Sequence, residues 1–225
     1  MVSAALNVAF SVLGLVLLLR TSQREPVTTY ETGFPSDLSS VKSQIQLTQN
    51  DFTGGVKLDE DGRFFTDHKS LQYVAPPSPE VDEAWDELLS GLNIDLESPE
   101  LEGRTFRWPE TGLYFTGLEV FHSLHCLNRL RQALYPDYYD VFADPQDPSR
   151  EDHIGHCINH LRQAIQCHSD LTPMEWKMVG NRLILDTATR HTCRDFNKIS
   201  EWASKRQTRF EDIEVIRNGT LFVVD

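Results

Sequence analysis

The sequence predicts a mainly α-helical protein, with an N-terminal transmembrane helix and a compact helical domain that carries small β-hairpins. Three observations support this fold class. The first is an apolar N-terminal run, MVSAALNVAFSVLGLVLLLR, which has no charged side chain before Arg20. The second is the recurrence of apolar residues at three- and four-residue steps in several later segments. The third is the presence of Asp-Gly and Asn-Gly pairs between short apolar segments, which are typical of hairpin turns.

The composition allows one main domain with a real hydrophobic core. The chain has 225 residues, of which 40% are hydrophobic, and a formal net charge of −13. An acidic chain is repelled by nucleic acid and by anionic membrane surfaces, so we expect no nucleic-acid partner. We divide the chain into an anchor helix at 1–20, a polar linker at 21–55 and a main domain at 56–225.

The apolar run at residues 2–19 is long enough to cross a bilayer. Its helix would measure roughly 27 Å at about 1.5 Å per residue, close to the thickness of the hydrocarbon core. A signal anchor is our preferred interpretation, because the basic segment that usually precedes a cleaved signal peptide is missing and a polar, proline-containing stretch follows. A cleaved signal peptide and a buried helix of a soluble protein are the alternatives.

The signals of membrane topology disagree with one another. Arg20 and Arg24 follow the apolar run, and the positive-inside rule alone would leave the main domain in the cytosol. The even number of cysteines, four, and the glycosylation sequon at Asn218 favour the lumen of the secretory pathway instead. We expect a single-pass membrane protein whose main domain is luminal and whose Asn218 is a glycosylation site.

The first elements of the main domain are a hairpin and a helix. The hairpin is predicted at 54–68, because Asp61-Gly62 offers a turn between two short apolar segments. The helix is predicted at 79–90, where Ser78 is a candidate N-cap and a proline occupies the first helical position.

Three longer helical patterns and a second hairpin follow. Apolar periodicity predicts helices at 113–134, 151–168 and 191–206. A further segment begins at Thr172, which is a candidate cap followed by a proline. The C-terminal stretch 214–225 is predicted to form a hairpin, because Asn-Gly lies between two β-branched runs.

The chain contains the pentapeptide His-x-x-His-Cys twice, as HSLHC at 122–126 and HIGHC at 153–157. Residues three and four apart share one face of a helix, so each copy presents two imidazoles and a thiol together. The proline-rich loop between the two predicted helices favours an antiparallel pair, which brings the copies face to face. The six candidate metal ligands are His122, His125, Cys126, His153, His156 and Cys157.

A single copy would be a weak sign of a metal site, because paired histidines occur by chance on many helices. The matched flanks, HCLNRLRQAL and HCINHLRQAI, make a metal site the favoured interpretation. An open site indicates chemistry rather than a structural role, so the four motif histidines are the candidate catalytic residues. His160 and His191 are additional ligand candidates, and Arg194 or Asp195 could orient a ligand.

The donor types narrow the choice of metal. Imidazole suits zinc, copper, iron and nickel, and thiolate draws zinc or Cu(I). Neither pentapeptide contains a carboxylate, so a hydrolytic zinc site with a glutamate base is not supported. A histidine-rich, carboxylate-poor set favours copper, with zinc and iron left open. One four-histidine site and two smaller sites are both compatible with the spacing.

The cysteines allow an argument from distance. Cys157 and Cys167 are ten residues apart on one predicted helix, hence about 15 Å apart, which exceeds the roughly 7 Å limit for a disulfide. Two of the three complete pairings survive. Either Cys126 bonds Cys157 and Cys167 bonds Cys193, or Cys126 bonds Cys167 and Cys157 bonds Cys193. In a reducing compartment the same residues would be thiolate ligands or buried thiols.

With these motifs the chain resembles the UstYa family of fungal proteins. The resemblance covers roughly residues 80–206 and rests on both His-x-x-His-Cys copies, on VDEAWDEL, on YPDYY and on HTCRDFNKISEWA. It implies a single-pass membrane oxidase with copper as its metal. Such a protein cyclises, hydroxylates, desaturates or halogenates a peptide or another secondary-metabolite precursor. Residues 56–225 would then be the catalytic domain.

Two questions about partners and class stay open at the sequence level. A heterodimer with a second UstYa-like chain is compatible with the resemblance. The rival interpretation is a non-enzymatic metal-binding module, with structural zinc or as a metal carrier, that supports a partner oxidase.

Overall fold

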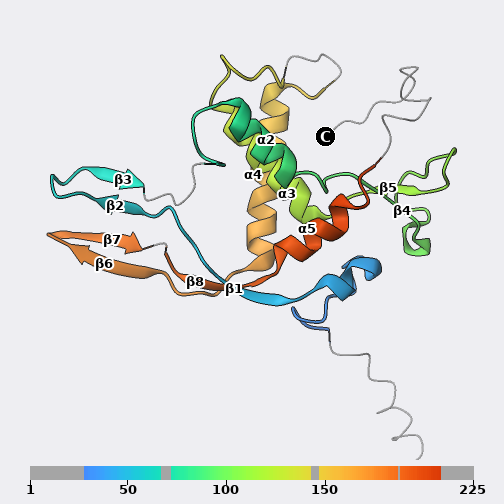
Figure 1. The fold of residues 1–225 in the computed structure, drawn as a ribbon, viewed down its shortest axis with the longest axis horizontal. Helices are drawn as coiled ribbons and strands as arrows, with labels where there is room; N and C mark the ends of the chain where they lie inside the picture. Colours follow the sequence, from blue (N-terminus) through green and yellow to red (C-terminus); the bar gives the residue numbers. More distant parts are fainter. Residues whose placement is uncertain (1–27, 67–71, 143–146, 187, 209–225) are drawn as a thin grey trace, which may run out of the picture. The chain divides into compact units, whose positions relative to one another are not determined.

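The computed structural model describes residues 28–66, 72–142, 147–186 and 188–208 (Figure 1). The predicted anchor at 1–20, the sequon at Asn218 and the predicted C-terminal hairpin lie outside the described residues. Of the helices in the described ranges, none has the length and apolar character that a bilayer crossing requires. Helices take up 36% and strands 20% of these ranges, so the fold is mixed rather than mainly α.

The chain divides into two compact units, Met1–Lys42 and Ser43–Asp225. A short 3-10 helix, η1 (Ser39–Gln44), crosses the boundary. In the second unit, strand β1 (Leu47–Asp51) occupies part of the segment that the sequence assigns to a polar linker. Its antiparallel pairing with a distant strand gives this polar segment a defined structure.

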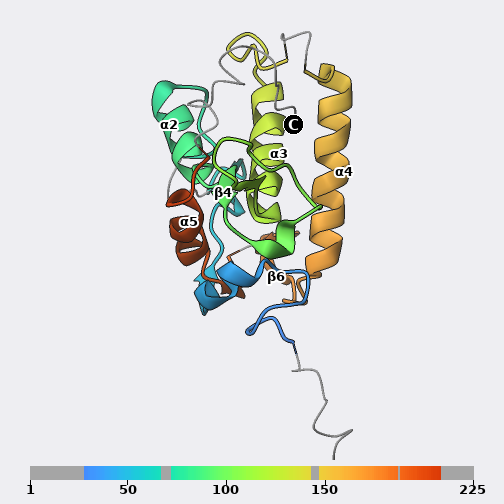
Figure 2. The same ribbon diagram turned by 90° about the vertical axis from the view of Figure 1, so that its right-hand side faces the viewer.

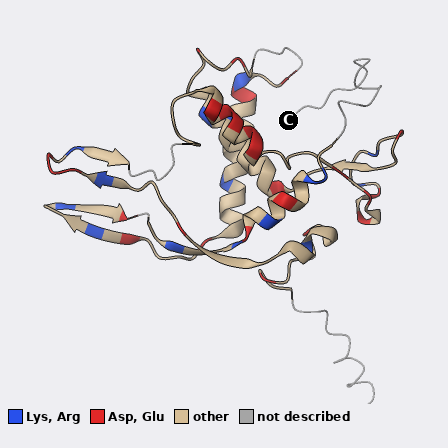
Figure 3. Ribbon diagram, in the orientation of Figure 1, with Lys and Arg blue, Asp and Glu red and all other residues tan. Residues whose placement is uncertain are grey.

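Helix α2 (Pro79–Leu88) begins as predicted. The side chain of Ser78 accepts a hydrogen bond from the backbone N–H of Val81, which satisfies one of the unpaired donors of the first turn. Trp85 and two smaller apolar side chains of the helix are buried. The acidic residues of α2 appear as red segments along the helix in Figure 3.

Helix α3 (Glu119–Ala133) begins six residues later than predicted. The preceding residues form strand β5 (Tyr114–Thr116), which pairs with β4 (Ile94–Leu96). Gly117 separates strand from helix, and a Cβ there would lie 2.4 Å from the carbonyl oxygen of Leu92. This close approach requires glycine at the junction between the strand and the helix.

Helix α4 (Arg150–His168) matches its prediction closely. Ser149 caps it through the N–H of Asp152, and Ser169 ends it in the left-handed conformation. It packs along α3 as an antiparallel neighbour, as Figures 1 and 2 show. The pair forms the scaffold of the predicted metal site.

The predicted helix at 191–206 is wrong in its first third. Strand β8 (Arg190–Arg194) comes first and pairs with β1, and helix α5 (Phe196–Ser204) follows. Asp195 separates the two elements, because its side chain caps α5 through the N–H of Asn197. A cap inside a periodic pattern is a start signal, and here it sets the true start of the helix.

Two hairpins complete the fold. Strands β2 (Val56–Leu58) and β3 (Phe64–Thr66) form the predicted first hairpin, with Gly62 at a φ of 78° in its turn. The segment after Thr172 is not helical: it is strand β6 (Glu175–Val179), which pairs with β7 (Arg182–Asp186). The hairpins lie side by side in Figure 1. The guanidinium of Arg182 in β7 donates to the carbonyl of Gly62 at 3.3 Å.

The core lies where α2, α3 and α5 meet. Phe121 of α3 and Ala203 of α5 are completely buried. Gly91, just after α2, lies against both of them, because a Cβ there would be 2.5 Å from the Cβ of Ala203 and 2.8 Å from the ring of Phe121. This packing holds one face of α3 inside the protein and leaves the opposite face for α4.

A polar network adds a second tie between α2 and α3. The guanidinium of Arg131 lies 3.3 Å from a carboxylate oxygen of Asp82 and donates to the hydroxyl of Tyr139 at 2.7 Å. The same hydroxyl donates to Asp82 at 2.6 Å, and the pKa of Tyr139 is raised by burial and by this carboxylate. Every polar group in the network has a charged or hydroxyl partner, so it fixes α3 without an uncompensated charge.

Candidate metal centre

The two motif copies pair reciprocally across the α3–α4 interface. His122 of α3 faces His156 of α4, with ring centroids 5.3 Å apart. His125 faces His153, with centroids 6.0 Å apart. The first histidine of each motif therefore meets the second histidine of the other, as an antiparallel helix pair requires.

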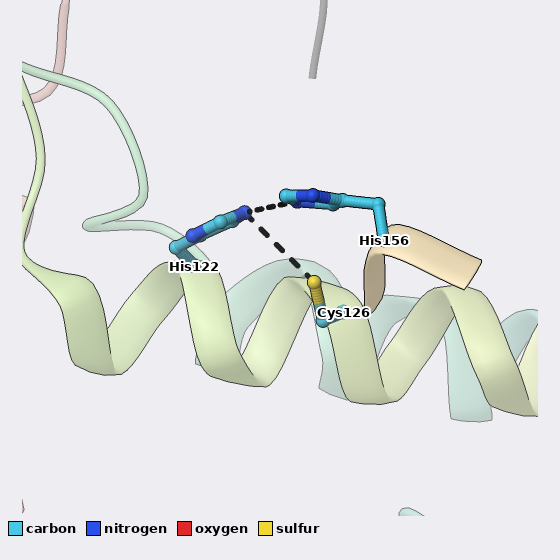
Figure 4. A group of neighbouring side chains, drawn as sticks. All are labelled: His122, Cys126 and His156. Carbon is cyan, nitrogen blue, oxygen red and sulfur yellow. Dashed lines mark hydrogen bonds between the residues drawn. The ribbon is translucent and has the colours of Figure 1, made fainter. Parts of the chain in front are cut away.

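We call His122 and His156 the outer pair and His125 and His153 the inner pair. A thiol lies beside the outer pair. The Nε2 atoms of His122 and His156 are 3.2 Å apart, and the Sγ of Cys126 is 3.8 Å from the Nε2 of His122 (Figure 4). One donor atom from each of these three residues lies within 4.8 Å of the others. Donors bound at about 2.0–2.3 Å to one ion are roughly 3–4 Å apart, so this group fits a single metal ion.

Burial changes across the outer group. Cys126 is completely buried, His122 is half-buried and His156 is exposed. Three protein donors leave at least one coordination position of a tetrahedral ion for another ligand. An ion held by these three residues would be accessible from the solvent-exposed side of His156.

The inner pair has a drier environment. His153 has only 4% of its surface exposed, and the Nε2 atoms of both His125 and His153 are shielded from solvent. The ring of Phe142 meets the ring of His153 edge-on at 5.8 Å. The Nε2 atoms of the inner pair are thus shielded from water.

The second motif cysteine is separated from the outer group of donors. Cys157 is completely buried on α4, but it is not one of the residues whose donor atoms cluster around His122. Cys167 is exposed, Cys193 is half-buried, and both are free thiols. The structure therefore contains neither complete disulfide pairing, and the two pairings stay predictions for an oxidised protein.

His160, an additional candidate from the sequence, lies beside the outer group. Its ring centroid is 4.0 Å from that of His122. Its Nε2 is 2.9 Å from the hydroxyl of Ser123 and 3.8 Å from a carboxylate oxygen of Glu119. Glu119 itself was missed at the sequence level, although it precedes His122 by three residues and so shares its helical face.

His191, the other additional candidate, is engaged elsewhere. Its Nδ1 is 2.7 Å from a carboxylate oxygen of Asp170, and its Nε2 is 2.8 Å from the hydroxyl of Thr189. Its ring stacks on Phe52 with centroids 3.8 Å apart. With both nitrogens and one ring face occupied, His191 holds β8 against the turn after α4 and is not part of the metal group.

The two residues proposed to orient a ligand belong to the β8–α5 junction. Asp195 is the N-cap of α5, and Arg194 is the last residue of β8. The capping role of Asp195 gives this carboxylate a structural partner.

The carboxylate of Asp170, which contacts His191, has its pKa lowered to about 2. The chief cause is hydrogen bonds from the backbone and side chain of Thr172, followed by the hydrogen bond with His191.

Comparison with known proteins places the chain in a family. A family model described as "Mycotoxin biosynthesis protein UstYa" matches residues 1–206. The UstYa family oxidase phomYc of Diaporthe leptostromiformis is 33% identical over 192 residues, which cover 75% of this chain and 72% of the relative. The oxidase phomYd of the same fungus is 33% identical over 208 residues, covering 84% and 67%.

Another relative has a higher identity over a shorter stretch. The UstYa family oxidase VicYb of Bipolaris victoriae (strain FI3) is 41% identical over 97 residues, which cover 41% of this chain and 81% of the relative. No solved structure matches the chain.

Proposed function

The chain belongs to the UstYa family of mycotoxin biosynthesis proteins, and from this premise we propose that its paired histidine motifs hold copper and that it oxidises a peptide or another secondary-metabolite precursor. It is a UstYa family oxidase, and hence an oxidoreductase of fungal secondary metabolism. The observation that carries the proposal is the convergence of His122, Cys126 and His156 from two helices.

The donor set and the reaction class together support copper. Imidazole and thiolate donors suit copper and zinc among the first-row metals. Zinc has no redox chemistry, whereas an oxidase needs a centre that accepts electrons. When bound here, copper would supply one-electron oxidation of the substrate, with dioxygen as the final oxidant.

The residues of the chain would hold the ion from one side and leave the other side to the substrate. Cys126 anchors the group in the buried interface, while His156 lies at the exposed edge. His153 and Phe142 keep water from the inner side. A substrate therefore approaches from the side of His156, where the orientation of its C–H or O–H bond relative to the site decides which bond is oxidised.

The substrate and the setting of the protein are parts of the same proposal. Cyclisation, hydroxylation, desaturation and halogenation all begin with the oxidation of a substrate bond, so one site could serve each. We propose that the apolar run at 2–19 anchors the chain in a membrane with its catalytic part in the lumen. A second UstYa-like chain is its proposed partner in a heterodimer.

The test uses purified full-length protein loaded with Cu(II). Reduction with ascorbate should abolish its electron paramagnetic resonance signal, and re-exposure to air should restore it. His156→Ala should reduce the bound copper and abolish this cycle. His168→Ala is the matched control, because His168 lies on the same helix, is exposed and is not in the group.

The rival interpretation, a non-enzymatic module with structural zinc, predicts a different result. Elemental analysis of the protein as isolated would find zinc alone, and a copper-selective chelator would leave substrate oxidation by cells that express the protein unchanged. Either result would contradict the copper proposal.

A further inference from the structure

We propose that Glu119, His122 and His160 form a second metal site, which shares the His122 ring with the first site and suits a different metal, Fe(II). This inference rests on the proposed function, because it takes His122, Cys126 and His156 as the first site. The donor atoms of the second set also lie within 4.8 Å of one another.

The two ring nitrogens of His122 face different groups. Its Nε2 is 3.2 Å from the Nε2 of His156 and 3.8 Å from the Sγ of Cys126. Its Nδ1 is 3.6 Å from a carboxylate oxygen of Glu119. The ring can therefore serve one ion with each nitrogen, as a bridge between adjacent sites.

The carboxylate of Glu119 lies between two imidazoles. The oxygen that faces the Nδ1 of His122 is also 3.8 Å from the Nε2 of His160. Two donors that bind one ion at about 2.0–2.2 Å are roughly 3 Å apart, so a small movement of one side chain would complete the geometry. The side chain of Glu119 is 86% exposed and has room to make that movement.

The chemistry of the second set differs from that of the first. Two histidines and one carboxylate with open positions are the donor set of non-haem Fe(II) oxygenases. The first set offers a thiol in place of the carboxylate, which draws copper or zinc instead. A single helix pair thus presents a nitrogen–sulfur site and a nitrogen–oxygen site on the two sides of one ring.

The asymmetry of the helix pair supports this assignment. The motifs alone would make the outer and inner histidine pairs equivalent. Only the outer pair has Glu119 and His160 beside it, and neither residue belongs to a motif. The inner pair has the ring of Phe142 at its edge instead.

Metal binding at the second site would require a local change. The hydroxyl of Ser123 lies 2.9 Å from the Nε2 of His160, so the ion would displace it.

Anaerobic titration with Co(II) tests the proposal, because Co(II) bound by a thiolate has a near-ultraviolet charge-transfer band that carboxylate and imidazole ligands lack. The wild-type protein should bind two Co(II) ions and show this band. Glu119→Ala and His160→Ala should each lose one ion and keep the band. Cys126→Ser should lose the band and keep an ion at the second site.

The matched control is Glu151→Ala, which removes an exposed carboxylate from the first turn of α4, as Glu119→Ala does in α3. It should leave both ions and the band unchanged. A wild-type protein that binds one Co(II) with the band, and is unaffected by Glu119→Ala, would overturn the second site and leave the proposed function intact. A wild-type protein that binds no Co(II) would overturn both.

Discussion

Among the residues of the site, His122 is the one on which the others converge. His156 and Cys126 approach one of its nitrogens, Glu119 approaches the other, and the ring of His160 packs beside it. When a carboxylate lies beside the second nitrogen of a metal-binding histidine, it fixes the orientation of the ring and makes the histidine a stronger ligand. The position of the His122 ring therefore determines which donor atoms come together in the site.

Replacing Cys126 tests whether its thiolate binds the metal or its thiol is only buried in the interface. We predict that Cys126→Ser lowers the affinity for copper at least about 10-fold, because the hydroxyl is a far weaker ligand for a soft metal. Competition with a chromophoric chelator measures the change. The control is Cys167→Ser, which alters an exposed cysteine of α4 and should leave the affinity for copper unchanged. Equal affinities for all three proteins would show that Cys126 only fills space.

At the scale of elements, the site depends on how α3 is held between α2, α5 and α4. Substituting Gly91 tests this packing. We predict that Gly91→Ala lowers the free energy of unfolding by about 1–3 kcal/mol, because its Cβ would overlap Ala203 and Phe121 in a filled core. Urea denaturation provides the measurement.

Gly155→Ala is the matched control within a helix. Apart from its chain neighbours and the backbone of its own helix, no heavy atom of the described residues lies within 4 Å of a Cβ at Gly155, and the position is exposed. Alanine is favoured over glycine in a helix interior by roughly 0.5–1 kcal/mol, so this variant should be more stable than the wild type. A Gly91→Ala protein as stable as Gly155→Ala would contradict the packing described around α3.

The hydrogen bonds that the Asp170 carboxylate accepts in the turn after α4, chiefly from Thr172 and then from His191 of β8, should respond to acid. The pKa of Asp170 is about 2 in the folded protein, below its ordinary value of 3.8. A lowered pKa means that the charged carboxylate stabilises the fold above about pH 4 and that this contribution is lost as the pH falls toward 2. We predict that the difference in melting temperature between wild type and Asp170→Asn shrinks over this interval. A constant difference from pH 6 to pH 2 would argue against these hydrogen bonds to the Asp170 carboxylate.

The sequence predicted those elements whose local signals agreed. Helix α4 was predicted from its apolar period, and its serine N-cap and left-handed C-cap residue in the structure confirm nearly the same bounds. The start of α3 was misplaced because a short apolar run fits strand and helix equally. The motif histidines were found by their repetition. Glu119 was not, since an acidic residue in the first turn of a helix needs no further reason. The pairing of His122 with His156 depends on helix packing, which spacing alone does not contain.

At the scale of the molecule, the site belongs to the unit Ser43–Asp225, and the family match extends over residues 1–206. The helix pair that bears the motifs brings together residues more than thirty positions apart in the sequence. The acidic balance of the chain, with a net charge of −13, is compatible with a small-molecule or peptide substrate and disfavours nucleic acid. The central claim is thus local: a redox metal lies between α3 and α4.

Anomalous diffraction from a crystal of the copper-loaded protein tests this claim most directly. Data collected above and below the copper absorption edge locate the ion without assuming its ligands. We predict a copper peak within about 2.5 Å of the Nε2 atoms of His122 and His156 and of the Sγ of Cys126. Copper found only at other residues, or a peak between α3 and α4 that persists below the copper edge because another metal occupies the site, would contradict the account.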